Sequence, residues 1–231
     1  RGLGDVYKRQ KLFILFISGF LIFINWGVWI YAVSQDKIID ASFGYFIMPI
    51  ISVFLGNFFF KELITKKGKI SIFLVIISVI YLLILDFGSI PWVGLIVALS
   101  WSFYNLFRKK INVETDLGLL IESLYILPFV LVAFYFVTIN NFNDFSLSKP
   151  SLMPLLMLAG PMTVIPLFLY VRGVELAGLG PAGMIFYITP TLQFILGFFI
   201  YNEQFNINQL VSFILIWIAV FIYLKDIYEK N

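Results

Sequence analysis

The chain contains no cysteine and no histidine. The absence of cysteine excludes disulfide bonds and thiolate metal sites, and the absence of histidine removes the commonest general base and metal ligand. Charged residues are also scarce, at 13% of the 231 residues, and the apolar stretches hold no adjacent pair of carboxylates. The sequence therefore does not favour an enzyme, and we expect no catalytic residues, no metal site and no cofactor.

In place of charge, the sequence has long apolar stretches. Apolar residues make up 61% of the chain and the mean hydropathy is +0.98, well above the values of soluble domains. Eight stretches of roughly 17 to 23 residues are each long enough, as a helix, to cross a hydrocarbon core about 30 Å thick. They lie near residues 12–33, 40–60, 70–86, 91–107, 118–139, 152–171, 180–201 and 208–224. We therefore predict an all-α integral membrane protein, a helical bundle of about 8 transmembrane spans.

The basic residues divide unevenly between the two sides of this expected bundle. Alternate connections place fourteen Lys and Arg residues on one side and two, Lys37 and Lys149, on the other. Because positive charge is enriched in cytoplasmic loops, we expect both ends of the chain to face the cytoplasm. The basic runs then serve as topology signals and lipid contacts, so no nucleic-acid partner is expected.

The first ten residues, RGLGDVYKRQ, do not share the apolar pattern of the next stretch, residues 12–33. We interpret residues 1–10 as a non-native leader and leave them out of the fold argument. Without them the basic count is eleven against two, so the expected orientation is unchanged.

One apolar stretch occurs twice, at a shift of 141 residues. Residues 45–62 match residues 186–203 at six of eighteen positions. Matched apolar residues mean little in this chain, but three further pairs keep their mutual spacing: Pro49 with Pro190, Gly56 with Gly197, and Glu62 with Glu203. The pattern indicates an internal repeat, with chance similarity of two hydrophobic helices as the alternative.

The shift aligns the first three spans with the last three, five crossings apart. Because five is odd, matched helices run in opposite directions, as in the inverted repeats of secondary transporters. Two spans then lack counterparts, so we expect a ten-span, five-plus-five inverted repeat from which this chain lacks the first two helices. Residues 11–87 would be the remainder of the first repeat, and residues 88–231 would be the second.

Several strings that contain polar residues support a family resemblance. They are NW at residues 25–26, ASFGYFIMPI from Ala41, GSIPWVGLIVALSWSFYNLFRKK from Gly88, LLIESLYILP from Leu119, AGPMTVIPL from Ala159 and YITPT from Tyr187. In these strings the chain resembles the EamA type of the drug/metabolite transporter superfamily and, within it, the RarD-like permeases. Met48 and Phe186 stand where the resemblance leads us to expect Asn and Gln, which points to a less polar substrate.

The resemblance implies a multi-pass permease of the bacterial cell (inner) membrane. It would be an exporter of small metabolites or drug-like compounds that works by alternating access. The expected partners are a small-molecule substrate and the lipid bilayer, with a homodimer left open. The alternative is a non-transporting or lipid-handling membrane subunit, and flux of a soluble solute would distinguish the two.

The candidate substrate-binding residues combine prolines, aromatic rings, amides and hydroxyls on several spans. A proline inside a transmembrane helix frees a carbonyl, and matched breaks in the two halves point to the site of an inverted-repeat transporter. The candidates are Asn25, Trp26, Tyr45, Pro49, Asn105, Thr163, Tyr187, Thr189, Pro190 and Gln193. The prolines alternatively only kink their helices. For Trp29, Tyr31, Trp101 and Tyr170 we favour an interfacial aromatic belt over the site.

Glu122 is the ionisable residue that stands out, because it lies inside an expected span, where an unpaired carboxylate is costly. Its candidate partners are Arg108 and Lys109 at the end of the preceding span. Glu122 either takes up a proton during transport or forms a structural or gating ion pair, and its shallow position favours the second. Glu62 and Glu203, which end matched helices, are expected to cap or latch the two halves.

Overall fold

The structure of the protein is a computed structural model, which describes residues 9–35, 38–87, 92–111, 113–140, 142–143, 145, 150–192 and 207–229. The elements are α1 (Arg9–Ser34), α2 (Ile38–Phe60), α3 (Lys66–Leu82), the π-helical η2 (Leu83–Phe87), α4 (Trp92–Ile111), α5 (Thr115–Ile139), α6 (Leu152–Ala177), α7 (Leu179–Ile185) and α9 (Ile207–Tyr228). A turn at Phe186 and Tyr187 separates α7 from a further helical segment, residues 188–192. Each of the eight predicted spans contains a helix, which confirms the all-α prediction.

Five helices are long and apolar enough to cross a membrane. They are α1, α3 with its extension to Leu85, α5, α6 and the part of α9 from Leu210. The apolar part of α2, Gly44–Phe60, is shorter, and α4 carries three basic residues in its last turn. Length and composition therefore support a multi-pass membrane protein.

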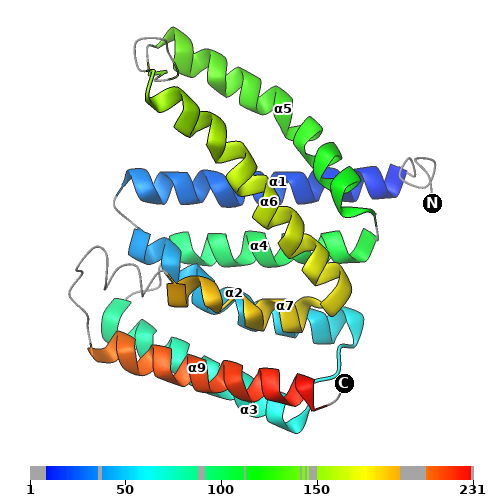
Figure 1. Ribbon diagram of the computed structural model, residues 1–231, viewed down its shortest axis with the longest axis vertical. Helices are drawn as coiled ribbons and strands as arrows, with labels where there is room; N and C mark the ends of the chain where they lie inside the picture. Colours follow the sequence, from blue (N-terminus) through cyan, green and yellow to red (C-terminus); the bar gives the residue numbers. More distant parts are fainter. Residues whose placement is uncertain are drawn as a thin grey trace.

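Successive spans run in opposite directions across the bundle (Figure 1). α1, α3, α5 and α7 begin at the end of the bundle where α2, α4, α6 and α9 finish. We call this the basic end, because the connection between α2 and α3 carries Lys61 and the helix ends there carry Lys66, Lys67, Arg108 and Arg172. The alternation matches the predicted distribution of positive charge.

The centre of the bundle is formed by α2, which packs against α4 on one side and α7 on the other. α1 packs against α4, and α3 packs against α9. The 141-residue shift pairs α2 with α7 and α3 with α9, so matched helices are neighbours in space and run antiparallel (Figure 1). Their shared core includes Phe46, Val53, Val75, Tyr187 and Phe213.

Small residues allow the central helices to approach closely. A Cβ on Gly44 of α2 would lie 2.6 Å from the carbonyl oxygen of Gly94 in α4. A Cβ on Gly183 of α7 would lie 2.8 Å from Cβ of Ser52 in α2. Since lipid tails are as apolar as the helices themselves, such close packing is a main source of helix association in a membrane.

α5 and α6 contact the rest of the bundle mainly near the basic end. The buried residues of α5 are Thr115, Gly118 and Glu122 in its first turns, and those of α6 are Val171 and Val174 near its end. Away from the basic end the two helices diverge from the other helices (Figure 1). Their contact with the bundle therefore depends on residues at one end of each helix.

Candidate functional site

The two halves of the chain meet at residues that the sequence repeat pairs with each other. The Tyr187 hydroxyl, in a side chain that is 1% exposed, donates a hydrogen bond to the carbonyl oxygen of Phe46 at 2.8 Å. The ring of Tyr45 stacks on that of Phe186, with centroids 5.8 Å apart. Both pairs are separated by 141 residues, the shift of the repeat. Contacts between matched residues are what an inverted repeat predicts near its axis.

Phe186 is also the centre of an aromatic cluster, which comprises Trp29, Tyr45, Trp101, Tyr170 and Phe186. Its ring centroid lies 5.8 Å from that of Trp101 and 5.2 Å from that of Tyr170, and those two rings lie 5.5 Å from each other. Trp29 extends the cluster through Tyr45, at 5.4 Å. Rings from α1, α2, α4 and α6 thus surround the break in the seventh span.

Trp101 and Tyr170, for which a belt is predicted, make ring contacts within the bundle, and their place in a belt stays a prediction. The turn after α7 directs Phe186 between α4 and α6, so these two rings pack against it inside the bundle. Trp29 likewise packs on Tyr45. Tyr31 is 43% exposed and lies beside Trp92 near the end of α1, so its place in a belt stays a prediction.

Asn105 supplies hydrogen-bonding capacity beside the aromatic cluster. Its amide nitrogen donates to the Tyr170 hydroxyl at 3.3 Å. Its amide oxygen is buried and has no hydrogen-bond partner in the described part of the chain. A buried acceptor without a partner is costly, and a bound donor group would remove that cost. Asn105 is therefore the predicted site residue whose geometry best suits ligand binding.

Other predicted site residues serve contacts within the protein. Asn25 donates to the Val97 carbonyl oxygen at 2.8 Å and to the Ser100 hydroxyl at 2.9 Å, which ties α1 to α4. The Thr163 hydroxyl donates to the carbonyl oxygen of Ala159 in its own helix at 2.7 Å. The Asn25 amide thus joins two helices, and the Thr163 hydroxyl bonds within its own helix. Neither group contributes to the aromatic cluster.

The two matched prolines have different surroundings. α2 continues without interruption through Pro49, whose carbonyl oxygen lies 3.3 Å from where a Cβ of Gly183 would be. In the second half the helix breaks at Phe186 and Tyr187, just before Thr189 and the buried Pro190. The expectation of matched breaks is thus wrong for the first half, where Pro49 serves close packing. Gln193 and Glu203 lie outside the described residues.

A groove of 860 Å³ lies between α1, α5 and α6. Its lining is mainly apolar, with Trp26, Asp116, Glu122 and Ser123 as the more polar members. Trp26 is 38% exposed, so it belongs to this groove and not to the aromatic cluster. The predicted binding residues therefore divide between two locations.

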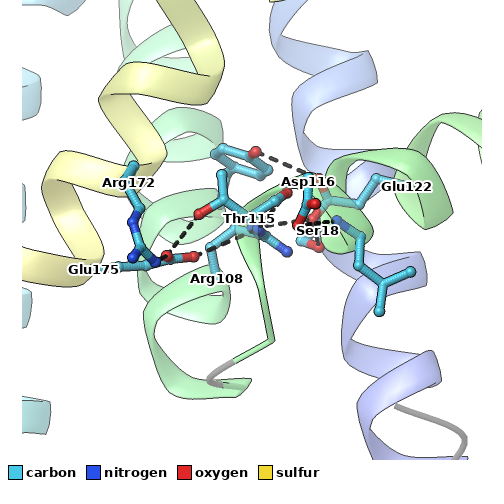
Figure 2. A network of polar contacts seen from close by, with 9 residues as sticks. Ser18, Arg108, Thr115, Asp116, Glu122, Arg172 and Glu175 are labelled. Carbon is cyan, nitrogen blue, oxygen red and sulfur yellow. Dashed lines mark hydrogen bonds and ion pairs between the residues drawn. The ribbon is translucent and has the colours of Figure 1, made fainter. Parts of the chain in front are cut away.

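Glu122 lies at the inner side of this groove, in a buried polar network (Figure 2). Its side chain is 3% exposed, and its carboxylate accepts hydrogen bonds from the Ser18 hydroxyl at 2.5 Å and the Tyr104 hydroxyl at 3.4 Å. Arg108, 1% exposed, places Nε 3.7 Å from Glu122 Oε1. The predicted pairing of Glu122 with Arg108 is confirmed.

Arg108 connects Glu122 to a second carboxylate on α6. Its Nη2 lies 3.6 Å from Glu175 Oε1 and donates to the Thr115 carbonyl oxygen at 3.3 Å. Glu175 also accepts from the Thr115 hydroxyl at 2.6 Å and from Arg172 at 3.3 Å. The network thus joins α1, α4, α5 and α6 near the basic end (Figure 2).

Lys109 does not pair with Glu122, as its candidate role suggested, but with Glu62. The Glu62 carboxylate also accepts hydrogen bonds from the backbone N–H groups of Leu179 and Gly180, both at 2.9 Å. A residue from the connection between α2 and α3 therefore caps the start of α7 in the other half. The prediction that Glu62 caps or latches the two halves is confirmed.

Sequence reasoning missed Ser18, Thr115 and Glu175. Ser18 is a small hydroxyl within an apolar span, a pattern that also fits simple helix packing. Glu175 lies beyond the predicted end of the sixth span at residue 171, whereas α6 continues to Ala177. With the helix end at Ala177, Glu175 falls in the last turn of α6, on a helix that packs against α4 and Arg108.

Comparison with known proteins agrees with this geometry. The profile of the EamA-like transporter family matches residues 3–84 and 89–225. The chain belongs to the EamA-like transporter family. It is 35% identical to Protein RarD of Escherichia coli (strain K12) over 221 residues, which covers 96% of this chain and 74% of that protein. This EamA-family chain is also 33% identical to an uncharacterized transporter of Vibrio cholerae, covering 96% and 74% of the two chains.

A third relative extends the similarity to another group of bacteria. The uncharacterized transporter YojE of Bacillus subtilis is 32% identical, over 96% of this chain and 73% of its own length. These relatives are named as transporters or as RarD proteins, and none of the three is named as an enzyme. The chain is accordingly a membrane permease of the drug/metabolite type.

Proposed function

We propose that this EamA-family protein is a secondary transporter that exports a small organic solute across the bacterial inner membrane by alternating access. The observation that carries the proposal is the contact between counterpart residues: Tyr45 with Phe186, and Phe46 with Tyr187. Two similar halves that meet at equivalent positions in antiparallel helices can rock about their contact. Such rocking opens a central site first to one side and then to the other.

The Glu62 contacts supply a closure at the basic end. For that end to open, the Glu62 carboxylate has to release the Leu179 and Gly180 N–H groups and the Lys109 ammonium. The connection between α6 and α7 is the single residue Gly178, at φ 101°. A Cβ there would lie 2.7 Å from Glu62 Oε1, so both the backbone conformation and the space require glycine. In the proposed mechanism Glu62 is the gate, with the exit on the opposite face.

The substrate we propose is flat, largely apolar and able to donate a hydrogen bond. The aromatic cluster offers ring faces for stacking, and the Asn105 amide oxygen offers an acceptor without a partner in the described residues. Met48, at a position where the resemblance predicts Asn, is buried and apolar. Small-molecule sites commonly combine aromatic walls with a few placed polar groups. Aromatic metabolites and drug-like amphipathic compounds fit this description.

Charge sets the expected orientation. With Lys61, Lys66, Lys67, Arg108 and Arg172 at the basic end, the positive-inside tendency places that end and both chain ends in the cytoplasm. The gate formed by Glu62 would then face the cytoplasm, where an exported solute enters.

The test is solute counterflow in vesicles that contain the complete gene product, with a panel of amino acids and aromatic metabolites. The Asn105→Ala variant should reduce flux about tenfold, the scale of one lost hydrogen bond to a buried group. Asn140→Ala, at an exposed helix end away from the cluster, is the matched control and should transport normally. Equal flux in both variants would contradict the proposed site.

The same assay addresses the alternative function. If none of the panel moves while lipid-linked compounds are flipped or bound, a lipid-handling function replaces transport of a soluble solute. Flux of one chemical class, inhibited by its unlabelled members, would support a transporter and would define the substrate class.

A further inference from the structure

The buried polar network joins two separate cavities. Glu122 lines the groove between α1, α5 and α6. Glu175 lines a second cavity of 360 Å³ at the basic end, together with Glu62, Lys109 and Asp226. Arg108 lies between the two carboxylates and is buried from solvent at 1% exposure. Each carboxylate is therefore reachable from a different cavity, and one arginine separates them.

Arg108 is shared between its two carboxylates and tightly bound to neither. Its Nε is 3.7 Å from Glu122 and its Nη2 is 3.6 Å from Glu175, both beyond good hydrogen-bond distance. Nε and Nη1 have no hydrogen-bond partner in the described part of the chain. A buried arginine that loses its only charged partner is strongly destabilising. Because a second carboxylate is present, Glu122 can lose its charge without leaving Arg108 alone.

Ser18 provides a hydrogen bond in either protonation state of Glu122. Its hydroxyl oxygen is 2.5 Å from Glu122 Oε1 and 3.1 Å from the carbonyl oxygen of Leu15. When Glu122 is ionised, the Ser18 hydrogen points to the carboxylate. When Glu122 is protonated, that hydrogen can turn to Leu15 and the Ser18 oxygen can accept the new proton, because a hydroxyl both donates and accepts.

We propose that Glu122 is a proton-binding site and that the proton is the coupling ion of transport, an inference that rests on the proposed transport function. A proton from water in the groove binds the Glu122 carboxylate and forms a neutral carboxyl that donates to Ser18. Arg108 then moves onto Glu175, which loosens α5 from α4. In the opposite conformation of the transporter Arg108 returns to Glu122, the carboxylate re-forms, and the proton passes to water on the other side of the membrane.

Charged and titratable groups face Glu122 from each element packed around it. α1 contributes Ser18 and the backbone at Gly19, with Arg9 and Lys11 about two turns or more before Ser18. α4 contributes Tyr104 and Arg108, and α6 contributes Glu175 and Arg172 through Arg108. On α5 itself, Asp116 accepts from its neighbouring backbone N–H. Two carboxylates, Glu122 and Glu175, thus balance the two arginines, and one bound proton changes that balance by one charge.

The test is infrared difference spectroscopy of the complete gene product in lipid nanodiscs across a pH series, without any transport substrate. A protonated-carboxyl band should appear as the pH falls, and the Glu122→Gln variant should lose it. Asp116→Asn is the matched control, because Asp116 lines the same groove but is exposed. This variant should keep the band and its midpoint.

Two further variants keep the proposal testable if Glu122→Gln does not fold. Glu175→Gln removes the second carboxylate, so Arg108 interacts with Glu122 alone and stabilises its ionised form. The midpoint of the band should therefore fall by about one pH unit, the scale of a charge effect within about 4–6 Å. Ser18→Ala removes a donor to the ionised form, so the midpoint should rise. An unchanged midpoint in both variants, or a band that persists in Glu122→Gln, would overturn the proposal.

The spectroscopic result is independent of solute flux. If the band behaves as expected but no solute moves in vesicles, the proton site stands and the transport proposal fails. If solute moves but the band is absent, transport uses another coupling ion or none, and the proton-site proposal fails. The two failures are thereby distinguished.

Discussion

At Gly118, the guanidinium group of Arg108 occupies the space where any other residue would place its side chain. A Cβ at this position would lie 1.7 Å from Nη1 and 2.5 Å from Cζ of Arg108. Arg108 is buried and held between two carboxylates, so its end cannot move into water. The size of residue 118 and the position of the buried arginine are therefore linked.

We predict that Gly118→Ala lowers the free energy of unfolding by about 3–5 kcal/mol, as when a buried ion pair is broken. Thermal unfolding of the purified protein measures the loss. Gly173→Ala, on α6 with no atom within 4 Å of its added Cβ, is the control and should be neutral or slightly stabilising. Equal melting temperatures for the two variants would contradict the tight fit of Arg108.

Glu62→Gln should weaken the contact between the halves at the basic end. The amide lacks the charge that Lys109 and the two N–H groups of α7 stabilise, and a hydrogen bond to a charged group contributes about 1.5–3 kcal/mol. We expect a lower melting temperature and faster proteolysis at the connection between α6 and α7. Glu114→Gln, whose side chain makes no capping bond, should behave like the wild type; similar losses in both would argue against a specific latch.

A surface ion pair between Lys67 and Glu229 also links the two halves at the basic end. The Lys67 ammonium, which hydrogen-bonds the carboxylate, holds the pKa of Glu229 below its usual range. Because the folded-state pKa is lowered, the stabilisation is present above the ordinary pKa of glutamate and is lost as the pH falls through the lowered one.

We expect Glu229→Gln to flatten the pH dependence of the melting temperature in that acidic window alone. Both side chains are well exposed, so salt should screen the difference between wild type and variant. Melting curves at low and high ionic strength test this. A difference that grows with salt would be inconsistent with an exposed ion pair.

Individual residue roles were predictable where the sequence limits the alternatives. Glu122 was identified because a carboxylate inside an apolar span needs a partner, and Glu62 because it repeats at a matched helix end. The roles of Asn25 and Lys109 were not predictable, since an amide or an ammonium can reach several helices and only packing selects one. Asn25 thus ties α1 to α4, although its residue type fits a binding site equally well.

At the scale of elements, α2 is joined to the turn that follows α7 by one buried hydrogen bond and one ring pair. Tyr187→Phe keeps the ring but leaves the Phe46 carbonyl without the donor at 2.8 Å. We predict a loss of about 0.5–1.5 kcal/mol, the net contribution of one hydrogen bond, seen as a lower melting temperature. Tyr31→Phe, on an exposed side chain of α1, should cost little, and an equal loss would show that the bond to Phe46 is not the cause.

The number and type of the elements were predictable from apolar length, but two details were not. α6 extends past its predicted end, and Glu175 in its last turn lies near Arg108 and pairs with the exposed Arg172. The seventh span breaks at Phe186, whereas α2 continues through Pro49. A proline only removes one hydrogen-bond donor, and neighbouring helices decide whether the helix bends, breaks or continues.

At the scale of the whole molecule, the matched helices are antiparallel neighbours: α7 packs on the central α2, and α9 packs on α3 at one edge of the bundle (Figure 1). The repeat pairs α1 with α6. When the halves rock, the distance between these two helices should increase at one end of the bundle and decrease at the other. The ion-pair network and the Glu62 latch both lie at the basic end. In the proposed mechanism, this conformation is the one in which the halves are joined at that end.

The most direct test of alternating access is a pair of spin-label distances in the cysteine-free chain, measured by pulsed electron paramagnetic resonance. One pair joins Phe13 to Leu176 at the basic end, and the other joins Val33 to Leu155 at the opposite end; all four side chains are exposed. Releasing the latch with Glu62→Gln should lengthen the first distance and shorten the second. Two unchanged distances, or two that lengthen together, would contradict rocking of the halves about their central contact.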